Sequence, residues 1–174
     1  MGLPTQSIFG YGWGDMKVST YQKKIKCSIS KLIELKEKLK FQALAFSGSS
    51  GAAIAFPVAA ALGIPVIYVR KPKEQSHGNS IEVLRGRSKA DIERYLIVDD
   101  FVSTGATVQH IYNSILKKCE KNTRSKKLAE CVGIFLWSDS KKQSSETIFN
   151  LKVPGSKRKM ESKLFQIYHA SSRR

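Results

Sequence analysis

Two adjacent carboxylates at positions 99 and 100 are followed, after two apolar residues, by a run of small and hydroxyl-bearing residues at 103–107. Residues 95–98 are apolar and predict a buried strand that carries the pair Asp99 and Asp100 to its end. The glycine and hydroxyl residues that follow lead into a helical pattern, and the free amides of a helix start are suited to bind a phosphate. Carboxylates repel a phosphate, but they accept hydrogen bonds from the hydroxyls of an attached sugar or help to hold a magnesium ion. The run therefore predicts a site for a ribose phosphate.

The whole run, residues 95–107, resembles the phosphoribosyl-pyrophosphate signature of the type I phosphoribosyltransferases. The resemblance implies that Asp99 and Asp100 face the 2- and 3-hydroxyls of the ribose. It also implies that the 5-phosphate is bound by Ser103, Thr104, Gly105, Ala106 and Thr107. The alternative is a capped strand-to-helix turn with a solvated acidic pair.

A second loop rich in glycine and serine follows the apolar residues 43–46. It stands where the family has its pyrophosphate loop, and the pattern from residue 49 to residue 62 resembles that of adenine phosphoribosyltransferases. Those enzymes carry an arginine at the position of Ser50. The resemblance implies that the pyrophosphate is bound by Gly48, Ser49, Ser50, Gly51 and Arg70. A plain turn is the alternative for this loop.

Residues 70–87 form a long polar segment that begins with a basic cluster. The segment is similar to the mobile catalytic loop of orotate phosphoribosyltransferases. This similarity implies that Lys71, Lys73 and His77 act on the departing pyrophosphate, with His77 or a lysine able to transfer a proton. The polar composition predicts a segment that is poorly ordered without ligand. The alternative is a solvated basic hairpin.

The acceptor predicted by the resemblance is a nucleobase, either a purine or an orotate-like base. Orotate enzymes carry an arginine just after the phosphate-binding run, where this chain has Gln109, and they have an N-terminal hood motif that is absent here. Adenine enzymes match the loop after residue 46 but not the segment at His77. Trp137, at the end of a predicted strand, is the candidate for stacking on the base. Other candidates for that role are Phe9, Tyr11 and Trp13, and packing in the core or hood is the alternative for each ring.

The elements that must position these residues are predicted from hydrophobic periodicity. Apolar residues from Ile25 to Leu39 recur at steps of three and four, which predicts an amphipathic helix, and Ser19 with Gln22 has the spacing of a capping box at its start. Further strands are expected at 64–69 and 131–137, and a helix at 106–119.

The alternation of strands and helices predicts an α/β fold, a central parallel sheet flanked by helices in a Rossmann-like arrangement. In such sheets ligands bind beyond the carboxyl ends of the strands, where both glycine-containing loops fall. We expect a single phosphoribosyltransferase domain over residues 1–174, with a core at about 19–138. A small hood is expected from residues 1–18, from residues 139–174, or from both.

The composition is that of a globular protein, with 41% hydrophobic and 25% charged residues. The longest apolar run, residues 52–63, is shorter than the ~20 residues that a membrane-spanning helix needs. No secretory signal is visible in residues 1–10. The three cysteines lack metal-ligand spacing, and their odd number favours a reducing compartment, so we expect a cytoplasmic protein.

The net charge of +16 is unusual, and residues 117–174 contain 15 basic but only 5 acidic residues. Such a surface attracts nucleic acid or an anionic substrate, or keeps the protein in solution. No nucleic-acid-binding motif accompanies it, so nucleic acid is an alternative partner that we do not favour.

The resemblance implies a magnesium-dependent enzyme that transfers ribose 5-phosphate from phosphoribosyl pyrophosphate to a nucleobase and releases pyrophosphate. It implies that Mg2+ is held mainly by phosphoribosyl pyrophosphate, with Asp99 and Asp100 as further candidate ligands, and that the protein is a homodimer. One alternative is a non-catalytic module that senses phosphoribosyl pyrophosphate and binds nucleic acid through its basic surface. Another is a relative of the ribose-phosphate pyrophosphokinases, but the chain is short for one and shows no ATP-binding segment.

Overall fold

A computed structural model describes residues 16–71, 74, 80–84, 92–121, 128–138, 148–152, 154 and 159–166. The helices are α1 (Val18–Leu39), α2 (Gly48–Leu62) and α3 (Ala106–Glu120). The strands are β1 (Ala43–Phe46), β2 (Val66–Val69), β3 (Ile81–Leu84), β4 (Arg94–Asp99), β5 (Glu130–Leu136), β6 (Ile148–Lys152) and β7 (Lys159–Gln166). None of these helices combines the length and the apolar composition that crossing a membrane requires.

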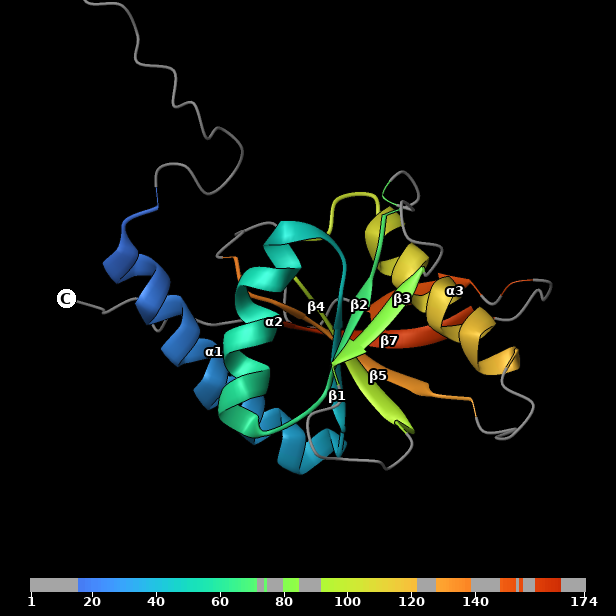
Figure 1. Ribbon diagram of the computed structural model, residues 1–174, viewed down its shortest axis with the longest axis horizontal. Helices are drawn as coiled ribbons and strands as arrows, with labels where there is room; N and C mark the ends of the chain where they lie inside the picture. The colour runs from blue at the N-terminus through green and yellow to red at the C-terminus, as the bar shows by residue number, and fades with distance from the viewer. Residues whose placement is uncertain are drawn as a thin grey trace, which may run out of the picture.

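The strands form one sheet in the order β3-β2-β1-β4-β5-β7-β6. The five central strands (β2, β1, β4, β5 and β7) are parallel to one another. At the two edges, β3 and β6 each pair antiparallel with the adjacent central strand. Figure 1 shows α1 and α2 on one side of the sheet and α3 on the other. The predicted α/β fold with a parallel sheet between helices is confirmed, and the structure adds an antiparallel strand at each edge.

The two faces of the sheet are covered by two separate hydrophobic clusters. Leu44 and Phe46 of β1 lie in the cluster under α1 and α2, and the alternate residues Ala43 and Ala45 lie in the cluster under α3. Because successive side chains of a strand point to opposite faces, a strand covered on both sides must be apolar at every position. This explains why β1 is a continuous apolar run. Packing on both faces of the sheet also keeps the strand ends in register where the loops leave the sheet.

Helix α1 confirms the predicted amphipathic helix, but the predicted capping box is wrong. The helix begins at Val18, so Ser19 lies inside its first turn, and the N-cap residue Lys17 makes no side-chain capping bond. The buried face of α1 also includes two polar residues, Lys24 and Ser28, beside the expected leucines.

Strand β3 lies within residues 70–87, which the sequence predicts to be a poorly ordered loop. Ile81 pairs with Val69 and Leu84 pairs with Val66 in an antiparallel ladder, so the prediction is wrong for residues 81–84. The available signal was the short apolar segment itself, which is typical of an edge strand.

At the other edge of the sheet, β7 pairs with β5 and β6 pairs with β7. The core of the fold therefore extends past the predicted limit at residue 138. The hood is predicted from residues 1–18, from residues 139–174, or from both, and of these the structure describes only 16–18, 148–152, 154 and 159–166.

Candidate functional site

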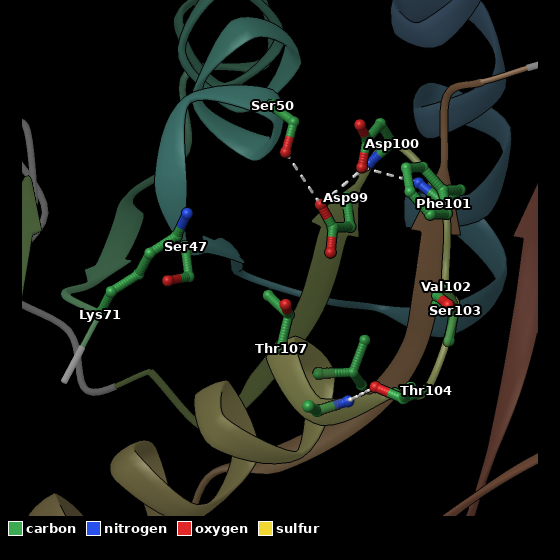
Figure 2. A pocket seen from close by; sticks show the side chains of 13 residues that line it. Ser47, Ser50, Lys71, Asp99, Asp100, Phe101, Val102, Ser103, Thr104 and Thr107 are labelled. Atoms are coloured by element: carbon green, nitrogen blue, oxygen red, sulfur yellow. Dashed lines mark hydrogen bonds between the residues drawn. The ribbon is translucent and has the colours of Figure 1, made fainter. Parts of the chain in front are cut away.

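A cavity of about 280 Å³ opens where strands β1, β2 and β4 end. Three segments that are far apart in the sequence line it: the start of α2, Lys71 two residues after the end of β2, and the loop from β4 into α3 (Figure 2). The lining residues are Ser47, Ser50, Lys71, Asp99, Asp100, Phe101, Val102, Ser103, Thr104, Gly105, Ala106, Thr107 and Val108. Parallel strands bring their carboxyl ends to one edge of the sheet, which is why these segments meet here.

The loop between β4 and α3 ends in an open helix start. Gly105 is the N-cap residue with a φ of 78°, a left-handed conformation that favours glycine, and no acidic residue lies in the first turn of α3. Thr104 Oγ1 accepts a hydrogen bond from the Ala106 amide at 3.3 Å. All five residues predicted to bind a 5-phosphate line the cavity, so the structure gathers the backbone amides of a helix start and hydroxyl groups at one end of it.

A second helix start, that of α2, faces the same cavity. Its N-cap Ser47 makes no side-chain capping bond, and its first turn contains no acidic residue. Ser47 was not among the predicted ligands, although it is the first residue of the serine–glycine loop and directly follows β1. Two helix N-termini whose first turns contain no acidic residue thus face one cavity, an arrangement that attracts anions.

The Lys71 side chain lies against the first residue of α2. A Cβ atom added to Gly48, whose φ is +74°, would come within 2.9 Å of Lys71 Cε and 3.1 Å of Nζ. Glycine at this position therefore permits both the backbone conformation and the close approach of the lysine. Among the described residues that line the cavity, Lys71 is the one with a cationic side chain.

The other residues of the predicted pyrophosphate loop have different surroundings. Ser50 lines the main cavity, whereas Gly48 and Ser49 line a neighbouring cavity of about 370 Å³. Gly51 is buried, and a Cβ atom there would lie 2.7 Å from Phe46 Cβ and 2.9 Å from the Val98 carbonyl oxygen. Gly51 therefore lets α2 pack closely on the sheet and lies outside the cavity lining.

The two carboxylates differ in their environment. Asp99 is only 6% exposed, and its Oδ1 accepts hydrogen bonds from Ser50 Oγ at 3.2 Å and from the Asp100 amide at 3.0 Å. Burial, reinforced by the negative charge of Asp100, raises the pKa of Asp99 to about 7. Asp100 is partly exposed, and its Oδ1 accepts a hydrogen bond from the Phe101 amide at 2.9 Å. The pair is therefore held by hydrogen bonds, and Asp99 is the more buried of the two.

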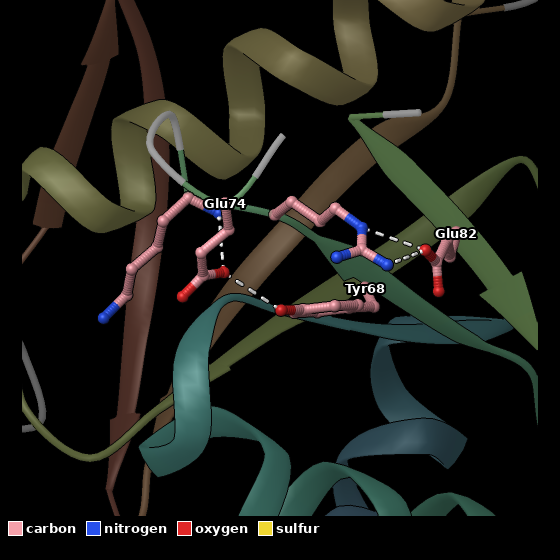
Figure 3. Close-up of polar contacts among 5 residues, drawn as sticks. Tyr68, Glu74 and Glu82 are labelled. Carbon is pink, nitrogen blue, oxygen red and sulfur yellow. Dashed lines mark hydrogen bonds and ion pairs between the residues drawn. The ribbon is translucent and has the colours of Figure 1, made fainter. Parts of the chain in front are cut away.

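The residues after β2 form a polar network at the entrance to the predicted mobile loop (Figure 3). Glu74 Oε2 accepts hydrogen bonds from the Tyr68 hydroxyl at 3.1 Å and from the Lys71 amide at 3.2 Å. Arg70 forms an ion pair with Glu82 of β3 and lies outside the lining of the main cavity. This position does not support the predicted contact of Arg70 with pyrophosphate. Lys73 and His77 lie outside the described residues.

Trp137 does not lie in the cavity. Its side chain is in the core between the sheet and α1 with 4% of the residue exposed, and its Nε1 donates a hydrogen bond to the Ser50 carbonyl oxygen at 3.0 Å. A buried ring leaves no face open to a base, which corrects the prediction that Trp137 stacks on the acceptor. The alternative candidates Phe9, Tyr11 and Trp13 lie outside the described residues.

Known proteins resemble this chain at the level of family and fold. The family model described as PRTase-CE matches residues 11–172. The structure of adenine phosphoribosyltransferase from Saccharomyces cerevisiae, complexed with D-2,5-dideoxy-2,5-imino-altritol 1,6-bisphosphate and adenine, is similar with a TM-score of 0.50. It is 21% identical, over 69% of this chain and 68% of that one. No curated protein matches the chain by sequence.

Two further solved structures are similar at lower scores. Adenine phosphoribosyltransferase from Thermoanaerobacter pseudethanolicus has a TM-score of 0.44 and 23% identity, over 69% of this chain and 73% of that one. Orotate phosphoribosyltransferase from Francisella tularensis has a TM-score of 0.47 and 16% identity, over 69% of this chain and 52% of that one. The chain thus spans about half the length of the orotate enzyme. The resemblance to type I phosphoribosyltransferases, and the fold that it implies, are confirmed.

Proposed function

We propose that this chain, which belongs to the PRTase-CE family, transfers ribose 5-phosphate from phosphoribosyl pyrophosphate to a nucleobase and releases pyrophosphate. The observation that carries the proposal is the convergence of two helix starts on one cavity that is also lined by the carboxylate pair Asp99 and Asp100. Phosphoribosyl pyrophosphate has the matching pattern, because a phosphate and a pyrophosphate flank a sugar that carries two free hydroxyls.

The 5-phosphate is assigned to the start of α3. The amides of its first turn supply hydrogen-bond donors, and the hydroxyls of Ser103, Thr104 and Thr107 supply more. Gly105, which is buried beneath this turn, lets the backbone approach the phosphate closely. Charged acceptors make stronger hydrogen bonds than neutral ones, so a dianionic phosphate is favoured here.

The ribose is assigned to the acidic pair and the pyrophosphate to the start of α2. Asp99 and Asp100 accept hydrogen bonds from the two ribose hydroxyls, and their negative charges stabilise the positive charge that develops on the sugar. Lys71, which lies against Gly48, stabilises the negative charge of the leaving pyrophosphate. Lys73 and His77 are proposed to join Lys71 when the loop closes.

A magnesium ion is compatible with these residues, although they do not form a complete binding site. Among the described residues no group of three or more histidine, cysteine or acidic side chains is arranged to hold a metal. The carboxylates offer hard oxygen ligands, and burial together with the negative charge of Asp100 raises the pKa of Asp99. We therefore propose that Mg2+ is held mainly by oxygens of phosphoribosyl pyrophosphate, assisted by Asp99 and Asp100. When bound, it neutralises charge on the leaving pyrophosphate.

The reaction is a displacement at the anomeric carbon of the ribose. The bond from this carbon to the pyrophosphate oxygen breaks with its electron pair leaving on oxygen, and a bond to a nitrogen of the base forms. The base loses one proton, for which His77 or a lysine of the loop is the proposed acceptor. The acceptor is proposed to be a purine or an orotate-like base, and the protein is proposed to act as a homodimer.

The deciding experiment incubates the protein with phosphoribosyl pyrophosphate, magnesium and a panel of free bases, and measures pyrophosphate release. We expect turnover with at least one base, and loss of that turnover in the double variant Asp99→Asn/Asp100→Asn. The double variant Glu34→Gln/Glu37→Gln, on the exposed face of α1, makes the same charge change away from the cavity and is expected to retain activity.

The outcomes separate the competing functions. Most of the activity surviving in the Asp99/Asp100 variant would show that the ribose assignment is wrong. Tight binding of phosphoribosyl pyrophosphate by the wild-type protein without turnover of any base would favour the sensing module over the enzyme.

A further inference from the structure

Trp137 connects the carboxyl end of the sheet to the start of α2 on the buried side of the cavity. It directly follows β5, and its amide donates a hydrogen bond to the Asp99 carbonyl oxygen at 3.2 Å. Its indole Nε1 donates to the Ser50 carbonyl oxygen at 3.0 Å. One residue therefore holds both the strand that carries Asp99 and the helical turn that carries Ser50.

Ser50 in turn contacts the carboxylate itself. Its hydroxyl donates to Asp99 Oδ1 at 3.2 Å, and Oδ1 also accepts the Asp100 amide at 3.0 Å (Figure 2). Both hydrogen bonds involve the same oxygen, and Figure 2 shows the second oxygen of Asp99 turned away from Ser50. The carboxylate is thus held at one oxygen, which leaves the other oriented for a ligand.

The indole is itself held from the opposite side by α1. Lys24 is buried, and its Nζ lies 3.5 Å from the Trp137 carbonyl oxygen and 5.8 Å from the centre of the ring. The side chain of Trp137 is therefore packed in one position between α1 and α2, and its N–H group is presented to Ser50.

We propose that Trp137 is a positioning residue that keeps the Ser50 hydroxyl on Asp99 Oδ1 and so orients the carboxylate toward the ribose hydroxyls. The inference rests on the proposed function, because it assumes that Asp99 binds ribose. Hydrogen bonds orient ligand-binding groups only when their own partners are fixed, and a shift of about 1 Å at such a group is enough to weaken binding greatly. The Ser50 hydroxyl alone does not fix the orientation of the Asp99 carboxylate, because Ser50 lies on the first turn of α2, a helix that has no side-chain cap.

The first test asks whether the contact depends on Trp137 and needs no ligand. The variant Trp137→Phe keeps an aromatic ring but removes the donor to Ser50. In a crystal structure of this ligand-free variant we expect Ser50 Oγ to have moved out of hydrogen-bonding distance of Asp99 Oδ1. Retention of that bond would overturn the inference whether or not the protein binds phosphoribosyl pyrophosphate.

The second test measures the affinity for phosphoribosyl pyrophosphate with magnesium by calorimetry. We expect Trp137→Phe and Ser50→Ala each to weaken binding about tenfold, as for one lost hydrogen bond to a charged group. Because both remove the same contact, the double variant should bind no more weakly than Ser50→Ala alone. Ser50→Thr, which keeps a hydroxyl, should restore most of the affinity.

A matched control separates positioning from general destabilisation. Phe41→Leu alters another buried aromatic residue of the same hydrophobic cluster. We expect it to lower the melting temperature and leave the affinity unchanged. Equal affinities of wild type and Trp137→Phe, or additive losses in the double variant, would overturn the inference. Failure of the wild-type protein to bind the ligand would instead reject the proposed function, and the crystallographic test would still decide the role of Trp137.

Discussion

The side-chain amide of Gln109 pairs with the main chain of Lys152 as a residue of a neighbouring strand would. Nε2 of Gln109 donates to the Lys152 carbonyl oxygen at 2.9 Å, and the Lys152 amide donates to Oε1 at 2.8 Å. Nε2 also donates to Asn113 Oδ1 at 2.8 Å. Gln109 stands at the position where orotate enzymes carry an arginine. Its side-chain amide thus connects α3 to β6, and its hydrogen-bonding groups already have protein partners.

This pairing predicts that Gln109 contributes to stability more than to ligand binding. Gln109→Ala removes both bonds to Lys152 and should lower the free energy of unfolding by about 1–2 kcal/mol. The matched control is Asn113→Ala, which removes only the hydrogen bond within α3. It should lower the free energy of unfolding by less than about 1 kcal/mol, as is typical of a surface substitution. Urea denaturation measures both values. A larger loss in the control than in Gln109→Ala would contradict the structural role of Gln109.

Lys71 is expected to act on the leaving group. Because the charge of pyrophosphate increases as its bond to the ribose breaks, Lys71→Ala should lower kcat about a hundredfold, with a smaller change in the affinity for phosphoribosyl pyrophosphate. Lys38→Ala makes the same change in net charge on the exposed face of α1, where Lys38 pairs with Glu34. That control should leave kcat unchanged. A Lys71→Ala variant with normal kcat would remove Lys71 from the catalytic residues.

Asp99 should make stability depend on pH near neutrality. Its pKa is raised from 3.8 to about 7, so the unfolded chain loses the proton at a lower pH than the folded protein does. The stability associated with the protonated carboxyl is therefore present below pH 3.8 and is lost as the pH rises to about 7. The full shift corresponds to about 4 kcal/mol at most. Asp99→Asn should abolish this decline.

The decline is measured by urea denaturation of wild type and Asp99→Asn between about pH 5 and about pH 8. Glu34→Gln is the control, because hydrogen bonds from Lys31 and Lys38 lower the pKa of Glu34 from 4.5 to about 2. Any contribution of Glu34 to the free energy of unfolding is thus lost only when the pH falls below the measured range. A wild-type protein whose stability does not decline relative to Asp99→Asn would show that Asp99 is ionised normally.

Gly51 is expected to be required for packing. Alanine at this position would bring its Cβ atom within 2.7 Å of Phe46 Cβ and 2.9 Å of the Val98 carbonyl oxygen, neither of which is a flexible side-chain end. Gly51→Ala should therefore destabilise the protein by about 1–3 kcal/mol through overpacking. Ser49→Ala, on the exposed side of the same helical turn, should change stability by less than about 0.5 kcal/mol. Thermal unfolding of the two variants tests this difference, and equal stabilities would contradict it.

The amino-acid sequence by itself determined the local arrangement of the site. The apolar run of residues 95–98 predicts a buried strand, so Asp99 and Asp100 are expected at its end. Gly105 and the hydroxyl residues around it are suited to a tight turn into a helix, and the periodicity of α1 is a property of that segment alone. These features depend on neighbours a few residues apart, which a sequence displays directly.

The tertiary structure decided which distant residues share the cavity. The strand order β2-β1-β4 brings Lys71 and Ser47 to the same edge as Asp99, and nothing in the spacing of these residues specifies that order. The tertiary structure also decided between two interpretations of Trp137, namely stacking on a base and packing in the core. Hydrophobic periodicity cannot separate the two, because the end of a strand can meet either a ligand or a helix. Here α1 and α2 cover that end, so the indole is buried and its N–H group bonds to Ser50. The tertiary structure likewise established strand β3 through its pairing with β2, since a short apolar segment within a polar stretch is only a weak signal in the sequence.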